Sequence, residues 1–247
     1  MILIYKIVRK RNNKNDIVPY RSKKDLEELA IKILTEYNID LINNAAPVPI
    51  ESIIEQYYNL ELDYQYLSSD GSVLGLIAFE TGHLQVYNPD SNKFYSIGVN
   101  SGTIIIDSAL AENNNNYGRY RFTCGHEFGH WELHKALFFS ENKMLFQNQS
   151  YVKCLNRDVE KSINRQNKTS KDWIEWQADY FSSALLMPYP TIREFYSECK
   201  KDTLKNTANE PYSEYTLNNR IIKKMSDYFE VSKEAMRIRL VNLNLIS

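Results

Sequence analysis

Apolar side chains recur at helical spacing in several separate stretches of the chain. After Ser22 and Asp25, which form the pattern of an N-terminal capping box, apolar residues return every three or four positions as far as Tyr37. This spacing predicts an amphipathic helix over residues 23–37, and Pro49 marks the start of a second helix. The same criteria predict further helices over residues 120–135, 171–187, 191–200, 214–229 and 232–242.

The middle of the chain has short β-favouring runs separated by Gly, Asn, Asp and Pro. The predicted strands are Leu60–Leu67, Val73–Phe79, Leu84–Tyr87 and Thr103–Asp107. We expect Glu80–Gly82 to form a hairpin turn between the second and third of them.

The order of helices, then strands, then helices indicates an α+β fold. We expect a small, mainly antiparallel sheet packed on the central helices, followed by a helical C-terminal extension. Residues 1–200 are predicted to form the main domain, and residues 201–247 a helix-turn-helix-like extension. Residues 136–170 are long for a connection and mix apolar with polar residues, so the pattern assigns them no element.

Composition narrows the class of protein. A chain of 247 residues with 43% hydrophobic composition can bury a substantial core, and a net charge of −1 indicates no broad basic surface. The apolar run Met1–Val8 is too short for a membrane span or a signal peptide. Three widely spaced cysteines suggest no disulfide framework. We therefore expect a cytoplasmic protein with no membrane partner.

The strongest chemical signal lies near the middle of the chain, where three of the four histidines fall within nine residues. His126, Glu127 and His130 form an H-E-x-x-H pattern. Residues four apart lie one turn apart on the same helix face, so both imidazoles can reach one zinc ion. Glu127 lies beside them, where it can serve a water molecule as general base.

A catalytic zinc site needs a third protein ligand. Gly125 and Gly129, four residues apart, indicate that another element approaches this helix closely. His134 lies about 12 Å along the axis from the first histidine, so a downstream carboxylate is the better candidate. We predict Glu175 as the ligand and Asp179 as the hydrogen-bond partner of a zinc-bound histidine. In the alternative, both carboxylates face solvent at a helix edge.

Other roles are more open. His134, Tyr151 and Tyr180 are candidates for contact with the substrate or the transition state, against ordinary packing roles. Thr103–Asp107 is either an edge strand that pairs with an extended substrate or a buried core strand.

Two segments resemble the signature blocks of the ImmA/IrrE zinc metallopeptidases, namely residues 121–134 and 175–188, with weaker similarity over 229–243. The resemblance implies a cytosolic protease with a thermolysin-like zinc site, with the ligands, the base and the supporting carboxylate at the positions assigned above. It also implies a helix-turn-helix transcriptional repressor as the protein that is cut.

Two rival interpretations belong to other classes. Residues 214–242 resemble a helix-turn-helix, and Lys233, Arg237 and Arg239 are candidate phosphate contacts of a DNA-binding regulator. Against this, the apolar residues of the second helix are expected to pack inward. The other rival is a partner-binding protein of the toxin–antitoxin type, with a structural or catalytically silent zinc site. The complete set of catalytic residues favours a zinc-dependent endopeptidase.

Overall fold

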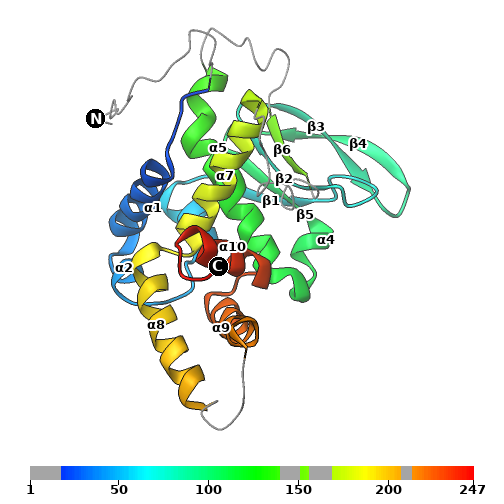
Figure 1. Cartoon of the computed structure of the whole chain (residues 1–247). Coiled ribbons are helices and arrows are strands. Elements are labelled where there is room, and N and C mark those ends of the chain that lie inside the picture. Colours follow the sequence, from blue (N-terminus) through cyan, green and yellow to red (C-terminus); the bar gives the residue numbers. More distant parts are fainter. Residues whose placement is uncertain (1–17, 140–150, 156–168, 207–212) are drawn as a thin grey trace.

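The computed structural model describes residues 18–139, 151–155, 169–206 and 213–247 (Figure 1). The longer helices are α1 (Lys23–Asn38), α5 (Tyr117–Phe139), α7 (Ser170–Leu186), α8 (Tyr189–Asn206), α9 (Glu214–Phe229) and α10 (Lys233–Asn242). The short helices are α2 (Asp40–Asn43), α3 (Ile50–Ser52), which continues into a π-helical turn (Ile53–Tyr57), α4 (Ser108–Ala111) and a 3-10 turn (Asn114–Asn116). The strands are β1 (Glu61–Gln65), β2 (Val73–Ala78), β3 (Gly82–Asn88), β4 (Lys93–Val99), β5 (Thr103–Asp107) and β6 (Tyr151–Leu155).

Several helices begin where side chains can satisfy the first backbone amides. Ser22 and Asp25 form the predicted capping box of α1, and Thr169 with Asp172 forms a second one at the start of α7. Ser232 caps α10 as predicted, by accepting a hydrogen bond from a backbone N–H group in the first turn. The local signals at Ser22 and Ser232 explain why the starts of α1 and α10 were predictable, whereas the box at Thr169 was not predicted.

Four strands form one sheet in the order β1-β5-β2-β6. β1 runs parallel to β5, whereas β2 is antiparallel to both β5 and β6. The predicted α+β class, with a small and mainly antiparallel sheet, is therefore confirmed. β5 is paired on both sides, so the alternative in which Thr103–Asp107 is an edge strand is wrong.

β3 and β4 form a separate two-stranded sheet. The hairpin predicted at Glu80–Gly82 is therefore wrong, because β2 and β3 belong to different sheets, and the hairpin lies at the β3–β4 connection instead. β4 was not predicted. Most of its residues are exposed, so its sequence lacks the alternation of apolar and polar residues that is typical of a half-buried strand. β6 lies within the unassigned residues 136–170 and pairs with β2.

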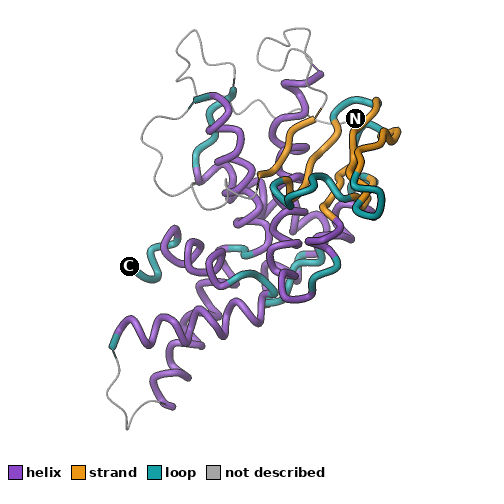
Figure 2. Tube along the Cα trace, turned by 90° about the vertical axis from the view of Figure 1, so that its right-hand side faces the viewer, coloured by secondary structure: helices purple, strands orange, loops and turns teal. Residues whose placement is uncertain are grey.

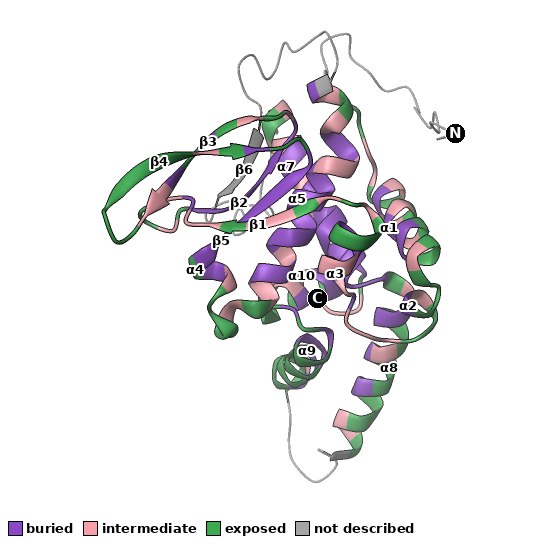
Figure 3. Cartoon of the chain, turned by 180° about the vertical axis from the view of Figure 1, so that it is seen from behind, coloured by how far each residue is buried: buried purple, intermediate pink, exposed green. Residues whose placement is uncertain are grey.

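Both faces of the central strands are covered, as the buried colouring of β2 and β5 in Figure 3 shows. Ile104 and Ile106 join the main core between the sheet and the helices, whereas Ile105 joins a smaller core with residues of the β3–β4 hairpin. Successive side chains of a strand point to opposite faces, so a strand buried on both faces is apolar throughout.

α5 lies between the sheet and α7. Figure 2 shows the strands gathered on one side of the molecule, and α5 contacts both β2 and β5 there. Its contact with α7 is the most extensive between any two described elements. The helix with the H-E-x-x-H pattern is thus covered on two sides.

The C-terminal helices pack into the same core as the rest of the described chain. The fully buried Arg239 donates a hydrogen bond to Glu27 (2.9 Å) and another to the backbone carbonyl of Met187 (2.9 Å). The interpretation of Arg239 as a phosphate contact is therefore wrong, because its guanidinium neutralises a carboxylate inside the protein. Arg237 is exposed and paired with Glu234. In the part of the chain that the structure describes, no helix is long and apolar enough to cross a membrane.

Candidate metal centre

Small residues allow α5 and α7 to lie unusually close together. A β-carbon at Gly125 would lie 2.6 Å from the Ser182 hydroxyl oxygen, and one at Gly129 would lie 3.0 Å from Phe181 and 3.3 Å from the Cα atom of Ala178. The two glycines are therefore required by the approach of α7, as predicted, and α7 is the helix that carries Glu175.

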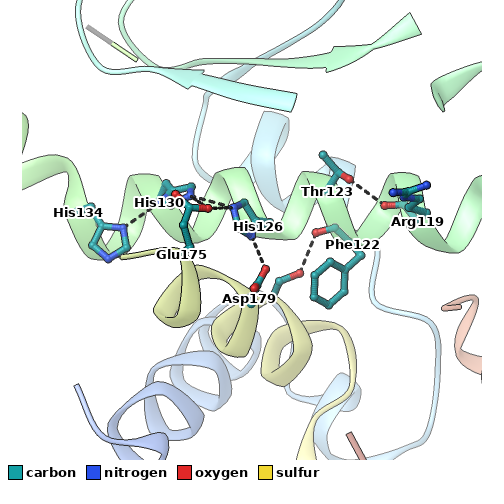
Figure 4. Close-up of polar contacts among 9 residues, drawn as sticks. Arg119, Phe122, Thr123, His126, His130, His134, Glu175 and Asp179 are labelled. Atoms are coloured by element: carbon teal, nitrogen blue, oxygen red, sulfur yellow. Dashed lines mark hydrogen bonds and ion pairs between the residues drawn. The ribbon is translucent and has the colours of Figure 1, made fainter. Parts of the chain in front are cut away.

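Three donor atoms converge at this contact, two from α5 and one from α7 (Figure 4). Nε2 of His126 lies 2.9 Å from Nε2 of His130. Oε2 of Glu175 lies 3.3 Å from the first nitrogen and 3.7 Å from the second. All three side chains are buried.

The donor set fits a tetrahedral zinc ion. Zinc–nitrogen and zinc–oxygen bonds of 2.0–2.2 Å place neighbouring ligand atoms about 3.3 Å apart in that geometry. Of the three separations, one is shorter than this value, one equals it and one is longer. Oε2 of Glu175 accepts no hydrogen bond from any described residue, although it is buried, and such an atom is costly unless a cation satisfies it.

The electrostatics of the centre favour the protonation states that bind metal. Burial alone would raise the pKa of the Glu175 carboxyl, but His130 and His126 outweigh it and hold the pKa well below its usual range. Burial lowers the pKa of His130, although Glu175 opposes the shift. Burial, together with the neighbouring His130, places the pKa of His134 well below its usual value. All three shifts favour the deprotonated forms, which are the forms that bind a metal ion.

Asp179 supports one of the ligand histidines. Its Oδ1 atom lies 2.8 Å from Nδ1 of His126. An ionised carboxylate can only accept, so Nδ1 carries the proton and Nε2 presents its lone pair to the centre. The structure brings Asp179 to the position expected for this contact.

Glu127 lies on the sheet side of α5 and is completely buried. A β-carbon at Gly75 of β2 would lie 3.2 Å from Oε1 of Glu127 and 2.7 Å from the Thr123 methyl group. The absence of a side chain at Gly75 therefore makes room for the carboxylate of Glu127. Sequence reasoning missed Gly75, because only the packing of β2 on α5 shows this contact.

The remaining candidates have other partners. Nδ1 of His134 lies 3.0 Å from Nδ1 of His130, and its Nε2 lies 3.1 Å from Oε1 of Gln177. The Tyr180 hydroxyl donates to Glu27 instead of pointing to the three ligand atoms. The side chain of Tyr151 lies outside the described residues. Gln177 was not predicted, and only its contact with His134 identifies it.

Comparison with known proteins gives one match to a family. The model of the peptidase M78 family, described as the IrrE N-terminal-like domain, matches residues 91–241, well over half of the chain. No curated protein matches the chain. Among solved structures, a Mycobacterium tuberculosis transcriptional regulator is similar at 12% sequence identity, with a TM-score of 0.43. The match covers 87% of this chain and 55% of that one, so the chain spans about half the length of the regulator.

Proposed function

The chain belongs to the peptidase M78 family with the IrrE N-terminal-like domain, and from this premise we propose that it is a zinc-dependent endopeptidase. The observation that carries the proposal is the buried cluster of His126, His130 and Glu175, with the buried Glu127 directly after His126 on α5. Three protein ligands and a neighbouring carboxylate are the composition of a catalytic zinc site, whereas structural zinc sites usually have four protein ligands.

The mechanism assigns a separate role to each group of the chain. When bound, zinc supplies a Lewis acid that polarises the scissile carbonyl and lowers the pKa of water to about 7. Glu127 takes a proton from the attacking water and then delivers it to the leaving amine. Asp179 holds the ring of His126 in the orientation and tautomer that a ligand needs.

The proposed substrate is an intracellular protein, and the first candidate is a helix-turn-helix transcriptional repressor. The metal centre alone does not identify the substrate, because substrate choice depends on surfaces outside it. The repressor is therefore proposed from the resemblance to the ImmA/IrrE metallopeptidases. The cytoplasm is the compartment that suits such a substrate.

Glu127→Gln tests the mechanism. We expect the variant to keep its zinc and lose at least about 100-fold in turnover, because an amide cannot act as the base. The measurement combines elemental analysis with mass spectrometry of the products formed from a proteome-derived peptide library and from a panel of helix-turn-helix repressors.

Glu132→Gln is the matched control, because Glu132 lies on the same helix and is also largely buried, but its carboxylate pairs with Lys135. It should cleave like the wild type. Wild-type turnover in Glu127→Gln would overturn the mechanism, and a zinc-loaded wild type that cleaves no peptide and no repressor would overturn the proposed activity.

A further inference from the structure

We infer that His134 is a positioning residue for the ligand His130, within a chain of hydrogen bonds that ends at the backbone carbonyl of Pro19. The inference rests on the proposed metal centre and adds two residues to it, His134 and Gln177. Neither donates to the metal directly. Their role is to hold the lone pair of His130 toward the other two ligands.

The chain of contacts crosses three segments of the protein. His130 and His134 lie on successive turns of α5, with their Nδ1 atoms 3.0 Å apart (Figure 4). Nε2 of His134 lies 3.1 Å from Oε1 of Gln177 on α7. Nε2 of Gln177 then lies 3.0 Å from the carbonyl oxygen of Pro19, which precedes α1. His130, His134 and Gln177 are all buried, so water does not compete for the bonds among them, whereas the bond to the exposed Pro19 is partly buried.

The Pro19 end sets the direction of every bond. A carbonyl oxygen can only accept, so the amide of Gln177 must turn its NH2 group to Pro19 and its oxygen to His134. Nε2 of His134 therefore carries the proton, and in a neutral ring its Nδ1 is left as an acceptor. That acceptor requires a proton on Nδ1 of His130, which leaves Nε2 of His130 with the free lone pair that a metal needs.

The two ligand histidines are thus supported in different ways by one helix. Asp179 of α7 supports His126 with a charged acceptor, whereas Gln177 of α7 supports His130 through a neutral imidazole. A charged acceptor makes a ligand imidazole more basic. The uncharged hydrogen-bond chain through His134 and Gln177 instead orients His130 without adding charge beside Glu175. The fixed tautomer, more than the charge, is therefore what His134 contributes.

Two substitutions at His134 separate positioning from packing. His134→Phe preserves a ring in the core but removes the acceptor, so we expect zinc binding to weaken about 10–100-fold. His134→Asn packs poorly, but its amide oxygen takes the place of Nδ1, so it should bind zinc more tightly than His134→Phe. If His134 only filled space, His134→Phe would bind zinc more tightly than His134→Asn.

The measurements are the zinc dissociation constant, from competition with a chromogenic chelator, and the absorption spectrum of the Co²⁺-loaded full-length protein. Leu133→Ala is the matched control, because it removes buried packing from the next position of α5 without touching a ligand. It should leave zinc affinity and the Co²⁺ spectrum unchanged.

If His134→Phe does not fold, Gln177→Leu and Gln177→Glu replace it. Gln177→Glu keeps an acceptor for His134, so it should retain more zinc affinity than Gln177→Leu. Equal zinc affinity in wild type and His134→Phe, or in wild type and Gln177→Leu, would overturn the inference alone. A folded wild type that binds no zinc would instead overturn the proposed function.

Discussion

Gly125 of α5 faces Ser182 of α7 so closely that a β-carbon on the glycine would lie 2.6 Å from the serine hydroxyl oxygen. That hydroxyl is in turn engaged, because it donates to the carbonyl oxygen of Phe122 at 2.9 Å. The spacing of the two helices at this contact is part of what brings Glu175 to the histidines. Residues without ligand roles therefore determine whether the three donor atoms meet.

We predict that Gly125→Ala destabilises the protein by about 1–3 kcal/mol, because the added methyl group overpacks the contact. Helix propensity alone would give the opposite sign, a gain of about 1 kcal/mol. Ser182→Ala should recover part of the loss in the double variant, although alone it costs about 1 kcal/mol through the lost hydrogen bond. The unfolding free energies of the wild type, the two single variants and the double variant give the coupling energy between Gly125 and Ser182. A Gly125→Ala protein more stable than the wild type would refute the prediction.

Removing the third ligand should empty the centre. We expect purified wild type to contain about one zinc ion per chain and Glu175→Ala to contain far less, because only two histidines remain. Added zinc should raise the thermal midpoint of the wild type and not that of the variant. Elemental analysis and thermal unfolding measure the two effects. If Glu175→Ala bound zinc with the occupancy and affinity of the wild type, the third ligand would have to be another residue.

Gly75→Ala should impair both stability and turnover, because its β-carbon would meet Thr123 at 2.7 Å and Glu127 at 3.2 Å. Thr123→Ser removes the methyl group but keeps the hydroxyl that bonds to the Arg119 carbonyl. The double variant should therefore regain stability while the crowding of Glu127 still slows cleavage. Unfolding and peptide cleavage are measured for both variants and for Thr123→Ser. If Gly75→Ala had the stability and turnover of the wild type, Gly75 would not be needed to make room for Thr123 and Glu127.

The buried ion pair between Glu27 and Arg239 should contribute strongly to stability. Glu27→Ala leaves a fully buried guanidinium without its carboxylate, which we expect to cost about 3–5 kcal/mol. Asp227→Ala is the matched control, because it breaks an exposed pair with Lys223 and should cost at most about 1 kcal/mol. Chemical denaturation measures both, and equal losses would contradict the expected effect of burial.

The ligand histidines were predictable because their geometry is local. Four residues make about one helical turn, so the spacing of His126 and His130 places both rings on one face whatever surrounds the helix. The two glycines in the same helix predicted the approach of another element, and two carboxylates on an apolar helix indicated α7. The Ser22–Asp25 capping box and the Ser232 cap predicted the starts of α1 and α10 for the same reason, since their hydrogen bonds span only a few residues.

Tertiary structure decided what depends on distant parts of the chain. β4 and β6 were missed and the hairpin was misplaced, because strand pairing is set by contacts between segments that sequence patterns do not relate. Arg239 looked like a surface cation until Glu27, 212 residues away, appeared beside it in the core. His134 and Gln177 gained a role only through the carbonyl of Pro19. The sequence by itself determined which residues can bind metal, and the packing of α5, α7 and the sheet decided how each is held.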